Sequence, residues 1–306
     1  MFLYNQFYGS AVDEDISIYV IDRSVEDEVL PYVENHWGFN FYAKRLDLQR
    51  RLKVGFYSLR RGDSVVDVVR QLSLGEQTEV RLTFNNIRNF SDLAARISTQ
   101  IAADSTSLYS AFTQWEGGDT TRLFSKFIPN TYSLYWSITP ESLIERMTRE
   151  SDKFWSGGRD EKRNSLGFSR EKIMTLASIV YEETKHIDEM PRVAGVYLNR
   201  LKRGMPLQAD PTVKYAIGDF SIKRILYKHL EYDSPYNTYK YKGLPPSPIS
   251  MPSIAAIDAV LSAESHNYLY FCARASFDGY HNFAKSYGEH LRYAREYSAA
   301  LNKLKL

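Results

Sequence analysis

The stretch from residue 169 to residue 186, SREKIMTLASIVYEETKH, constrains the fold more than any other part of this sequence. Apolar or small side chains recur in it at helical spacing, at Ile173, Leu176, Ala177, Val180 and Thr184. Ser169 is well placed to cap a helix, because its hydroxyl can accept a hydrogen bond from the first turn. The spacing therefore predicts one helix with an apolar face, and the rest of the chain has to bury that face.

Two adjacent glutamates near the end of this helix are predicted to have different surroundings. At about 100° per residue, Glu182 points away from the apolar side, towards water. Glu183 lies at the edge of the apolar side, one turn after Ile179 and Val180. Burial against apolar groups disfavours a charge, so we expect a raised pKa for Glu183, as a general acid requires. Periodicity by itself favours the plainer interpretation, a boundary glutamate with an exposed tip.

Composition restricts the class of protein. With 306 residues, 43% of them hydrophobic and 25% charged, the chain is long enough for two domains and is typical of globular proteins. The formal net charge of +2 and the lack of a recognisable basic module argue against nucleic-acid binding. The single cysteine, Cys272, excludes an internal disulfide and a cysteine-based zinc site. No window approaches the ~20 apolar residues of a membrane-spanning helix.

The first part of the chain predicts a small α+β unit. Residues 15–22 and 53–62 have strand patterns, and the segments between them, 25–36 and 39–52, have helical ones. A further helix follows and ends at Gly75, a residue that suits the left-handed conformation after a helix. A unit of this size is compatible with ligand binding and equally with a spacer or docking role.

The chain is therefore divided into an N-terminal domain, residues 1–80, and a mainly helical second domain, residues 81–306. Residues 156–160 are predicted to form a surface loop, residues 205–218 a compact irregular segment, and residues 236–252 a long loop that binds a ligand or covers the core. The other predicted elements are a strand-to-helix unit at 78–101 capped by Ser91, helices at 107–115, 120–128, 141–156, 188–203 and 252–265, a hairpin of 268–275 with 279–284, and a final helix from Tyr287.

Few side chains remain as candidates for chemistry. The histidines lack the spacing of a metal site, so no metal is predicted, and no nucleophile elbow or glycine-rich phosphate loop occurs. Cys272 lies in an apolar run, the wrong setting for a reactive thiolate. Carboxylates are left, with Glu183 the best-placed candidate and Asp210 a second group. A carboxylate pair favours a glycosidase, in which one group protonates the glycosidic oxygen.

Several ordered segments resemble the YceG-like family. They are LASIVYEET (176–184), the stretch 193–218 with LQADPTV, the stretch 236–253 with YNTY and GLPPSPI, and the hairpin strands within 268–284. Upstream, LKVGFYSLRRGDSVVDVVRQLSLGE and FIPNTY are similar to the family's N-terminal part, which includes a LysM-like region. The resemblance covers most of the chain and implies an α+β fold, with a small LysM-like domain before a helical catalytic domain that carries a small antiparallel sheet.

The resemblance implies an endolytic transglycosylase that cleaves the β-1,4 bond between N-acetylmuramic acid and N-acetylglucosamine within peptidoglycan strands. One glutamate acts as acid and then as base, and the muramoyl C6 hydroxyl closes onto C1 to give a 1,6-anhydro end without water. The family motif usually reads E-K/R-E-A/T, with the catalytic glutamate second. That position is Glu183 here, and Tyr181 replaces the first acid of the motif.

Further site candidates come from the matching segments. They are Gln208, Asp210 and Thr212 for orienting sugar or catalytic groups, Tyr236, Asn237 and Tyr239 for lining a glycan groove, and His281 and Asn282 for reaching in from the hairpin. No metal or organic cofactor is implied. The implied partners are glycan strands and peptidoglycan synthases. The family is anchored by one N-terminal transmembrane helix in the cell envelope, and we expect that helix to have been trimmed before residue 1.

Two alternatives remain open from the sequence. The first is a non-catalytic peptidoglycan-binding scaffold of the elongation machinery, against which the retained Glu183 argues. The second is a muramidase-type hydrolase, which would need a second carboxylate close to Glu183, with Asp210 the candidate.

Overall fold

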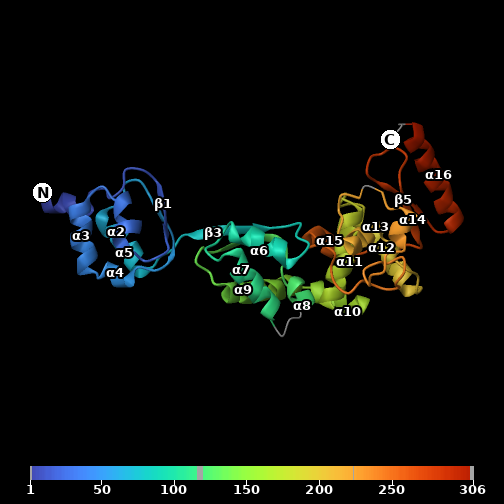
Figure 1. The fold of residues 1–306 in the computed structure, drawn as a ribbon, viewed down its shortest axis with the longest axis horizontal. Coiled ribbons are helices and arrows are strands. Elements are labelled where there is room, and N and C mark those ends of the chain that lie inside the picture. The colour runs from blue at the N-terminus through green and yellow to red at the C-terminus, as the bar shows by residue number, and fades with distance from the viewer. Residues whose placement is uncertain (1, 116–119, 223, 304–306) are drawn as a thin grey trace. The chain divides into compact units, whose positions relative to one another are not determined.

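The computed structural model describes residues 2–115, 120–222 and 224–303 (Figure 1). Its described part is α+β, as predicted, with many helices and three two-stranded sheets. The chain divides into two compact units. Unit 1 comprises Met1–Thr83, Ala94–Leu108 and Thr131–Leu143, and unit 2 comprises Phe84–Leu93, Tyr109–Asn130 and Ile144–Leu306.

Unit 1 contains two antiparallel strands with several helices between them in sequence. Strand β1 (Ile16–Val20) pairs with β2 (Gly55–Leu59), as predicted. The predicted helix 39–52 is wrong in one respect: it is broken, because Asp47 adopts a left-handed conformation with φ 53°. The elements of this region are α1 (Phe2–Tyr8), α2 (Val25–Glu28), η1 (Leu30–Tyr32), α3 (His36–Arg45), α4 (Leu48–Arg51) and α5 (Val65–Leu74).

The middle of the chain contains more strand than the sequence analysis predicts. Strand β3 (Glu79–Phe84) pairs with β4 (Asn130–Tyr135), which was not predicted. The helices here are α6 (Phe90–Ser98), α7 (Ser105–Gln114) and α8 (Thr120–Phe124). The predicted cap Ser91 is wrong, since the Asn89 side chain accepts the amide hydrogen of Asp92 at 2.8 Å.

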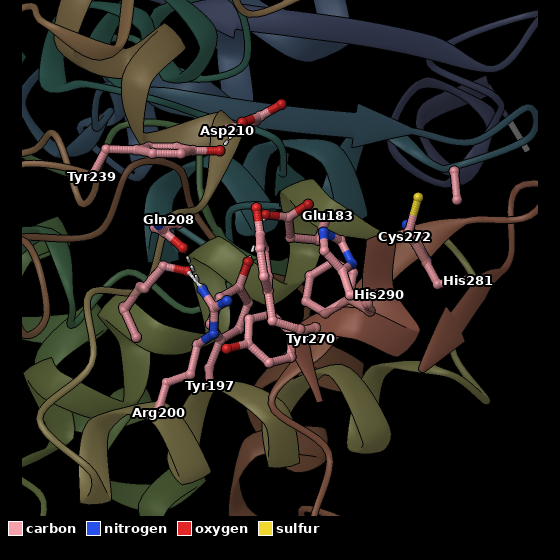
Figure 2. Close-up of a pocket in the computed structure, with 14 residues that line it drawn as sticks. Glu183, Tyr197, Arg200, Gln208, Asp210, Tyr239, Tyr270, Cys272, His281 and His290 are labelled. Atoms are coloured by element: carbon pink, nitrogen blue, oxygen red, sulfur yellow. Dashed lines mark hydrogen bonds between the residues drawn. The ribbon is translucent and has the colours of Figure 1, made fainter. Parts of the chain in front are cut away.

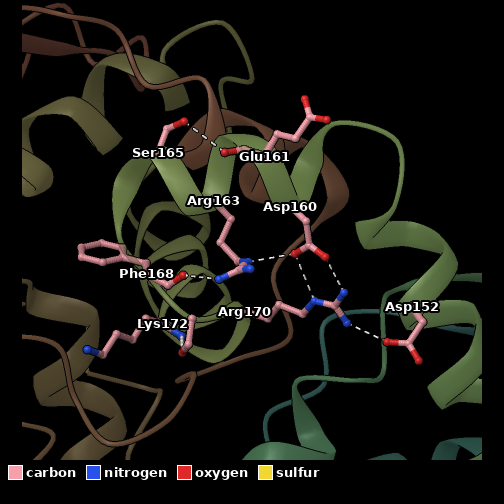
Figure 3. Close-up of polar contacts among 9 residues, drawn as sticks. Asp152, Asp160, Glu161, Arg163, Ser165, Phe168, Arg170 and Lys172 are labelled. Atoms are coloured by element: carbon pink, nitrogen blue, oxygen red, sulfur yellow. Dashed lines mark hydrogen bonds and ion pairs between the residues drawn. The ribbon is translucent and has the colours of Figure 1, made fainter.

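Helix α9 (Pro140–Trp155) and helix α10 (Arg159–Leu166) lead to the predicted central helix. The predicted loop 156–160 is shorter than expected: Gly157 and Gly158 have positive φ and turn the chain, and α10 starts at once. An ionic cluster joins the three helices (Figure 3). The Arg170 guanidinium donates to Asp160 and Asp152, and Asp160 also accepts from Arg163. This network ties the first residue of the central helix to the two helices before it.

The central helix, α11 (Arg170–Glu183), is buried more completely than one apolar face requires. The Ser169 hydroxyl accepts from Lys172 N and caps it, as predicted. Every residue from Ile173 to Val180 is buried. The core cluster of unit 2 packs around it, with helices α12 (Met190–Lys202) and α15 (Ile254–Leu261) in contact with it. The helix ends at Glu183, because Thr184 is extended with φ −138°.

The remaining elements of unit 2 surround the end of α11. Residues 210–217, predicted to be irregular, form helix α13 (Asp210–Ile217), with a proline in its first turn and Gly218 in the left-handed conformation after it. The predicted hairpin is confirmed as antiparallel strands β5 (Tyr270–Ala273) and β6 (His281–Ala284). Helices α14 (Tyr227–Leu230) and α16 (Tyr287–Lys303) complete the set. In the described ranges no helix is long and apolar enough to cross a membrane.

Candidate active site

A cavity of about 420 Å³ opens beside the C-terminal end of α11 (Figure 2). Six structural segments of unit 2 contribute to it: α11, α12, the segment entering α13, the loop that carries Tyr239, the hairpin and α16. Its polar lining consists of Glu183, Tyr197, Arg200, Gln208, Asp210, Tyr239, Tyr270, Cys272, His281, Tyr287 and His290. Residues more than 100 positions apart in sequence therefore share one pocket.

Glu183 is half-buried where α11 meets the cavity. Its Oε1 accepts a hydrogen bond of 2.6 Å from the hydroxyl of Tyr197, a buried residue of α12. The pKa of Glu183 is raised to about 7: burial is the largest cause, the negative charge of Asp210 acts in the same direction, and the Tyr197 hydrogen bond opposes them. A carboxyl group with this pKa holds a proton for much of the time at neutral pH and can also release it.

Asp210 lies in the same cavity at the start of α13. The Tyr239 hydroxyl donates to its Oδ1 at 2.6 Å (Figure 2). Burial and this carboxylate raise the pKa of Tyr239 well above its ordinary value, so the hydroxyl remains a donor. The structure thus brings together a carboxyl with a raised pKa, Glu183, and a second carboxylate, Asp210.

Arg200 forms part of the cavity wall and was not singled out from the sequence. It is buried, and burial lowers its pKa. Its Nε donates to Leu269 O at 2.7 Å and its Nη1 donates to Leu207 O at 2.6 Å. These bonds hold the segment before α13 and the start of the hairpin around the cavity, and Nη1 also lies 3.4 Å from Gln208 Oε1 (Figure 2).

Glu189 and His281 form a carboxylate–imidazole pair near this end of α11. Glu189 is buried just before α12, and its Oε2 lies 2.8 Å from Nδ1 of His281, the first residue of β6. His281 lines the cavity, whereas Glu189 stands behind it. Sequence reasoning named His281 and missed Glu189, because a glutamate in a short loop between two helices has no periodic pattern to mark it.

The other predicted site residues lie outside this cavity lining. Buried Thr212 bonds to Ala209 O and to Thr238, and Tyr236 bonds to Ser247. Asn237 is buried and donates to two backbone carbonyls, while its Oδ1 accepts from Tyr239 N, so it shapes the loop that presents Tyr239. Asn282 lies on β6 beside His281 without lining the cavity.

Glu182 does not point to water as the helical wheel predicts. Its side chain is 18% exposed and lies 3.6 Å from the guanidinium of Arg88. Arg88 in turn stacks on the ring of Phe220 at 4.1 Å. The two glutamates do face different surroundings, but both are partly covered, since residues far away in sequence pack against the Glu182 side of the helix.

Among the described side chains, no group of three or more His, Cys, Asp or Glu could hold a metal ion. Comparison with known proteins then places the chain. The model of the YceG-like family matches residues 12–296. The chain belongs to the YceG-like family. The match covers both the N-terminal unit's strands and every segment that lines the cavity.

Relatives within the YceG-like family carry the name endolytic murein transglycosylase. The protein of that name from Bacillus subtilis is 30% identical over 293 residues, 89% of this chain and 80% of its own length. The one from Streptococcus pneumoniae D39 is 28% identical over 85% of this chain and 53% of its own, so this chain spans about half of that relative. The 2.6 Å crystal structure of a YceG-like protein from Listeria monocytogenes superposes with a TM-score of 0.61, at 27% identity, over 91% of this chain and 98% of that one.

Proposed function

We propose that this chain is an endolytic peptidoglycan transglycosylase that cleaves the β-1,4 bond between N-acetylmuramic acid and N-acetylglucosamine within glycan strands. The observation that carries the proposal is Glu183: a half-buried carboxyl in a cavity, with its pKa raised to about 7, at the position for which the motif resemblance implies the catalytic glutamate. The relatives' shared name, endolytic murein transglycosylase, supports the substrate class.

In the first step, protonated Glu183 donates its proton to the glycosidic oxygen while the bond from C1 of the muramoyl unit to that oxygen breaks. Desolvation favours the neutral carboxyl before the step, and the Tyr197 hydroxyl stabilises the carboxylate that forms. The N-acetylglucosamine leaving group departs with a new hydroxyl, and positive charge develops at C1.

In the second step, the C6 hydroxyl of the same muramoyl unit attacks C1, and the Glu183 carboxylate accepts the hydroxyl proton. A bond from O6 to C1 forms, the 1,6-anhydro ring closes, and Glu183 returns to its protonated state. No water is consumed, so the step requires no second carboxylate. A pKa near 7 suits both steps, because Glu183 has to donate a proton in the first and accept one in the second at the same pH.

Mass spectrometry of digested glycan strands tests this proposal. Isolated strands are incubated with the parent chain, with Glu183→Gln and with Glu182→Gln as the neighbouring control. Anhydro-muramoyl ends produced by the parent and by Glu182→Gln, and lost in Glu183→Gln, are the expected result. Cleavage that persists in Glu183→Gln would contradict the assignment of Glu183 as the acid.

A muramidase-type hydrolysis is the second candidate, and Asp210 is the observation that favours it. Its carboxylate shares the cavity with Glu183 and could activate water. The same spectra distinguish the two reactions, since hydrolysis leaves reducing muramoyl ends. In that case Asp210→Asn would abolish cleavage, whereas under transglycosylation it leaves the anhydro product in place. Glycan binding without any cleavage by the parent would instead support the scaffold alternative.

We also propose that residues 1–80 form a LysM-like domain that contributes glycan affinity. Two antiparallel strands with helices between them in sequence, and a cavity of about 470 Å³ lined by residues of α2, α3 and α4, support this assignment. Asn40 lines that cavity with an exposed side chain. In the full chain carrying Glu183→Gln, Asn40→Ala should weaken binding to glycan strands, and unchanged binding would contradict a role for this cavity.

The cell envelope is the proposed site of action, because the substrate is found there. Peptidoglycan synthases stay the predicted protein partners, and an N-terminal membrane anchor stays a prediction from the family resemblance. Nucleic acid is not a proposed partner.

A further inference from the structure

Glu189 binds His281 through both of its carboxylate oxygens. Oε1 accepts the backbone amide hydrogen of His281 at 2.8 Å, and Oε2 lies 2.8 Å from the imidazole Nδ1. The Glu189 residue is only 3% exposed, and a side-chain hydrogen bond from Thr184 adds a further donor. Two contacts from one carboxylate fix both the backbone and the ring of His281.

The protonation state of this pair follows from the contacts. Burial alone would raise the pKa of Glu189, but the hydrogen bonds from His281 outweigh it and hold the pKa below its ordinary value. Glu189 is therefore a carboxylate at neutral pH, and a carboxylate only accepts hydrogen bonds. Nδ1 of His281 has to be the donor, so the neutral imidazole carries its lone pair on Nε2.

Nε2 is the polar atom that the His281 ring has left to offer. The His281 side chain is 12% exposed and lines the same cavity as Glu183. Its ring packs against Phe271 in a T-shaped arrangement, with centroids 5.2 Å apart and an interplanar angle of 81°. Nε2 makes no hydrogen bond to any residue in the described ranges. The imidazole is thus bonded through Nδ1 and packed against Phe271, with Nε2 available to a ligand.

We propose that His281 contacts the substrate, its Nε2 accepting a hydrogen bond from a hydroxyl of the glycan bound beside Glu183, and that Glu189 is the positioning residue that fixes the required tautomer. The inference rests on the proposed function, since the glycan is the ligand in question. It assigns Glu189, which touches no part of the cavity, a role that acts wholly through His281. Carboxylates that orient metal-bound histidines typically cost about 10- to 100-fold in activity when removed, and we expect an effect of that order for this pair.

Two substitutions separate this role from a structural one. In His281→Asn the shorter amide can still donate to Glu189 but lacks an atom in place of Nε2. In Glu189→Gln the amide can donate to Nδ1, which forces the ring proton onto Nε2. We expect each to lower kcat by about 10- to 100-fold with KM changed by less than about 3-fold, because the contact orients a reacting sugar. His229→Asn, at a histidine of α14 that lines neither of the two cavities, is the matched control and keeps parent activity.

A double-variant cycle tests whether Glu189 acts through His281. The variant carrying both substitutions should be no slower than His281→Asn alone, since Glu189 then has no imidazole left to orient. Multiplicative losses would overturn the assignment of Glu189 as a positioning residue. Parent-like kcat in His281→Asn would overturn the substrate contact, provided that its thermal unfolding matches that of the parent.

Nitrogen-15 NMR of the histidine rings gives a readout that does not depend on cleavage. The parent is expected to show His281 with its proton on Nδ1, and Glu189→Gln with the proton on Nε2. Glycan strands added to the Glu183→Gln chain should shift Nε2 of His281, and not the ring of His229. An unmoved Nε2 resonance with bound glycan would overturn the inference. Failure of the proposed function is distinct, because it would appear as reducing ends or as no cleavage by the parent.

Discussion

At the N-terminal end of α11, Asp160 accepts hydrogen bonds from two arginines, whereas at the C-terminal end Glu183 has one hydrogen bond from a neutral tyrosine. The Arg170 guanidinium is the largest influence on Asp160 and brings its pKa down to about 2. Burial is the largest influence on Glu183 and takes its pKa up to about 7. The pKa values of two carboxyl groups, Asp160 of α10 beside the start of α11 and Glu183 at the end of α11, are thus shifted in opposite directions by their surroundings.

This difference in pKa shows which of the two carboxyl groups can donate a proton at neutral pH. A carboxyl that is always ionised at neutral pH can hold helices together, as Asp160 does, but it has no proton to give. A carboxyl that is short of hydrogen-bond donors and shielded from water keeps its proton and becomes a general acid. Arginines bind the carboxylate beside the N-terminal end of α11. The buried Arg200 near Glu183 instead donates its hydrogen bonds to backbone carbonyl groups.

The largest expected effect is the difference in activity between a variant at Glu183 and a variant at Asp160. Glu183→Gln should lower kcat/KM for glycan cleavage by about 10³-fold, because it removes the proton donor. Asp160→Asn should leave kcat/KM within about 2-fold, since Asp160 is not part of the cavity. Steady-state assays on soluble glycan strands measure both. A loss of similar size in Asp160→Asn would contradict the assignment of a structural role to Asp160 and a catalytic role to Glu183.

Stability and activity should both fall as the pH rises, because both depend on the proton of Glu183. The folded chain holds the Glu183 proton up to about pH 7, whereas an unfolded chain releases it near 4.5, so the parent loses stability as the pH rises through that window. Glu183→Gln has no such loss and should be more stable by about 2 kcal/mol at pH 8, with no gain near pH 4. Thermal unfolding at both pH values measures this, and an equal gain at pH 4 would contradict the cause.

Asp210 is expected to affect the pH dependence of kcat/KM, because its charge acts on Glu183. Activity needs protonated Glu183, so it should fall as the pH rises past about 7. Asp210→Asn removes a negative charge that raises the pKa of Glu183, and the alkaline limb of kcat/KM should move to lower pH. Tyr197→Phe removes a bond that lowers this pKa, so the limb should move the other way. Limbs that do not move would mean that another group controls the profile.

The smallest expected effect lies at the structural end. Asp160→Asn should cost about 1 kcal/mol at pH 7, because the pair with Arg170 is partly open to water, each side chain being 32% exposed. The sign follows from its lowered pKa: the contribution is present above about pH 4 and is lost as the pH falls towards 2. Denaturant unfolding at pH 7 and pH 3 measures the difference, which should narrow at the lower pH.

Local patterns in the sequence predict the helices, caps and hairpins whose formation depends on residues close together in the chain. Helix α11, its Ser169 cap, the β1–β2 pair and the β5–β6 hairpin are all visible as periodicity and turn residues. Helix α13 was missed although its signals were present: a proline in the first turn and Gly218 after the last. The boundary between domains at residue 80 stays a prediction.

Contacts over long sequence separations could not be predicted in this way. The helical wheel separated Glu183 from Glu182, but it could not show that Arg88 would cover Glu182. Glu189 lies 92 positions from His281, and no spacing rule links a loop glutamate to a strand histidine. Family motifs placed Asn237 and Thr212 near the site, and the structure shows them bonded to the backbone and side chains that shape it. Motif membership does not distinguish a lining residue from a supporting one.

The most direct test of the account is the pKa of Glu183 itself. Carbon-13 NMR of the chain labelled at glutamate side-chain carboxyls, recorded from pH 4 to pH 9, follows each titration, and the resonance absent from Glu183→Gln identifies the group. The account predicts a midpoint of about 7 for that resonance. A midpoint below about 5, where ordinary glutamates titrate, would contradict the claim that the cavity keeps Glu183 protonated for catalysis.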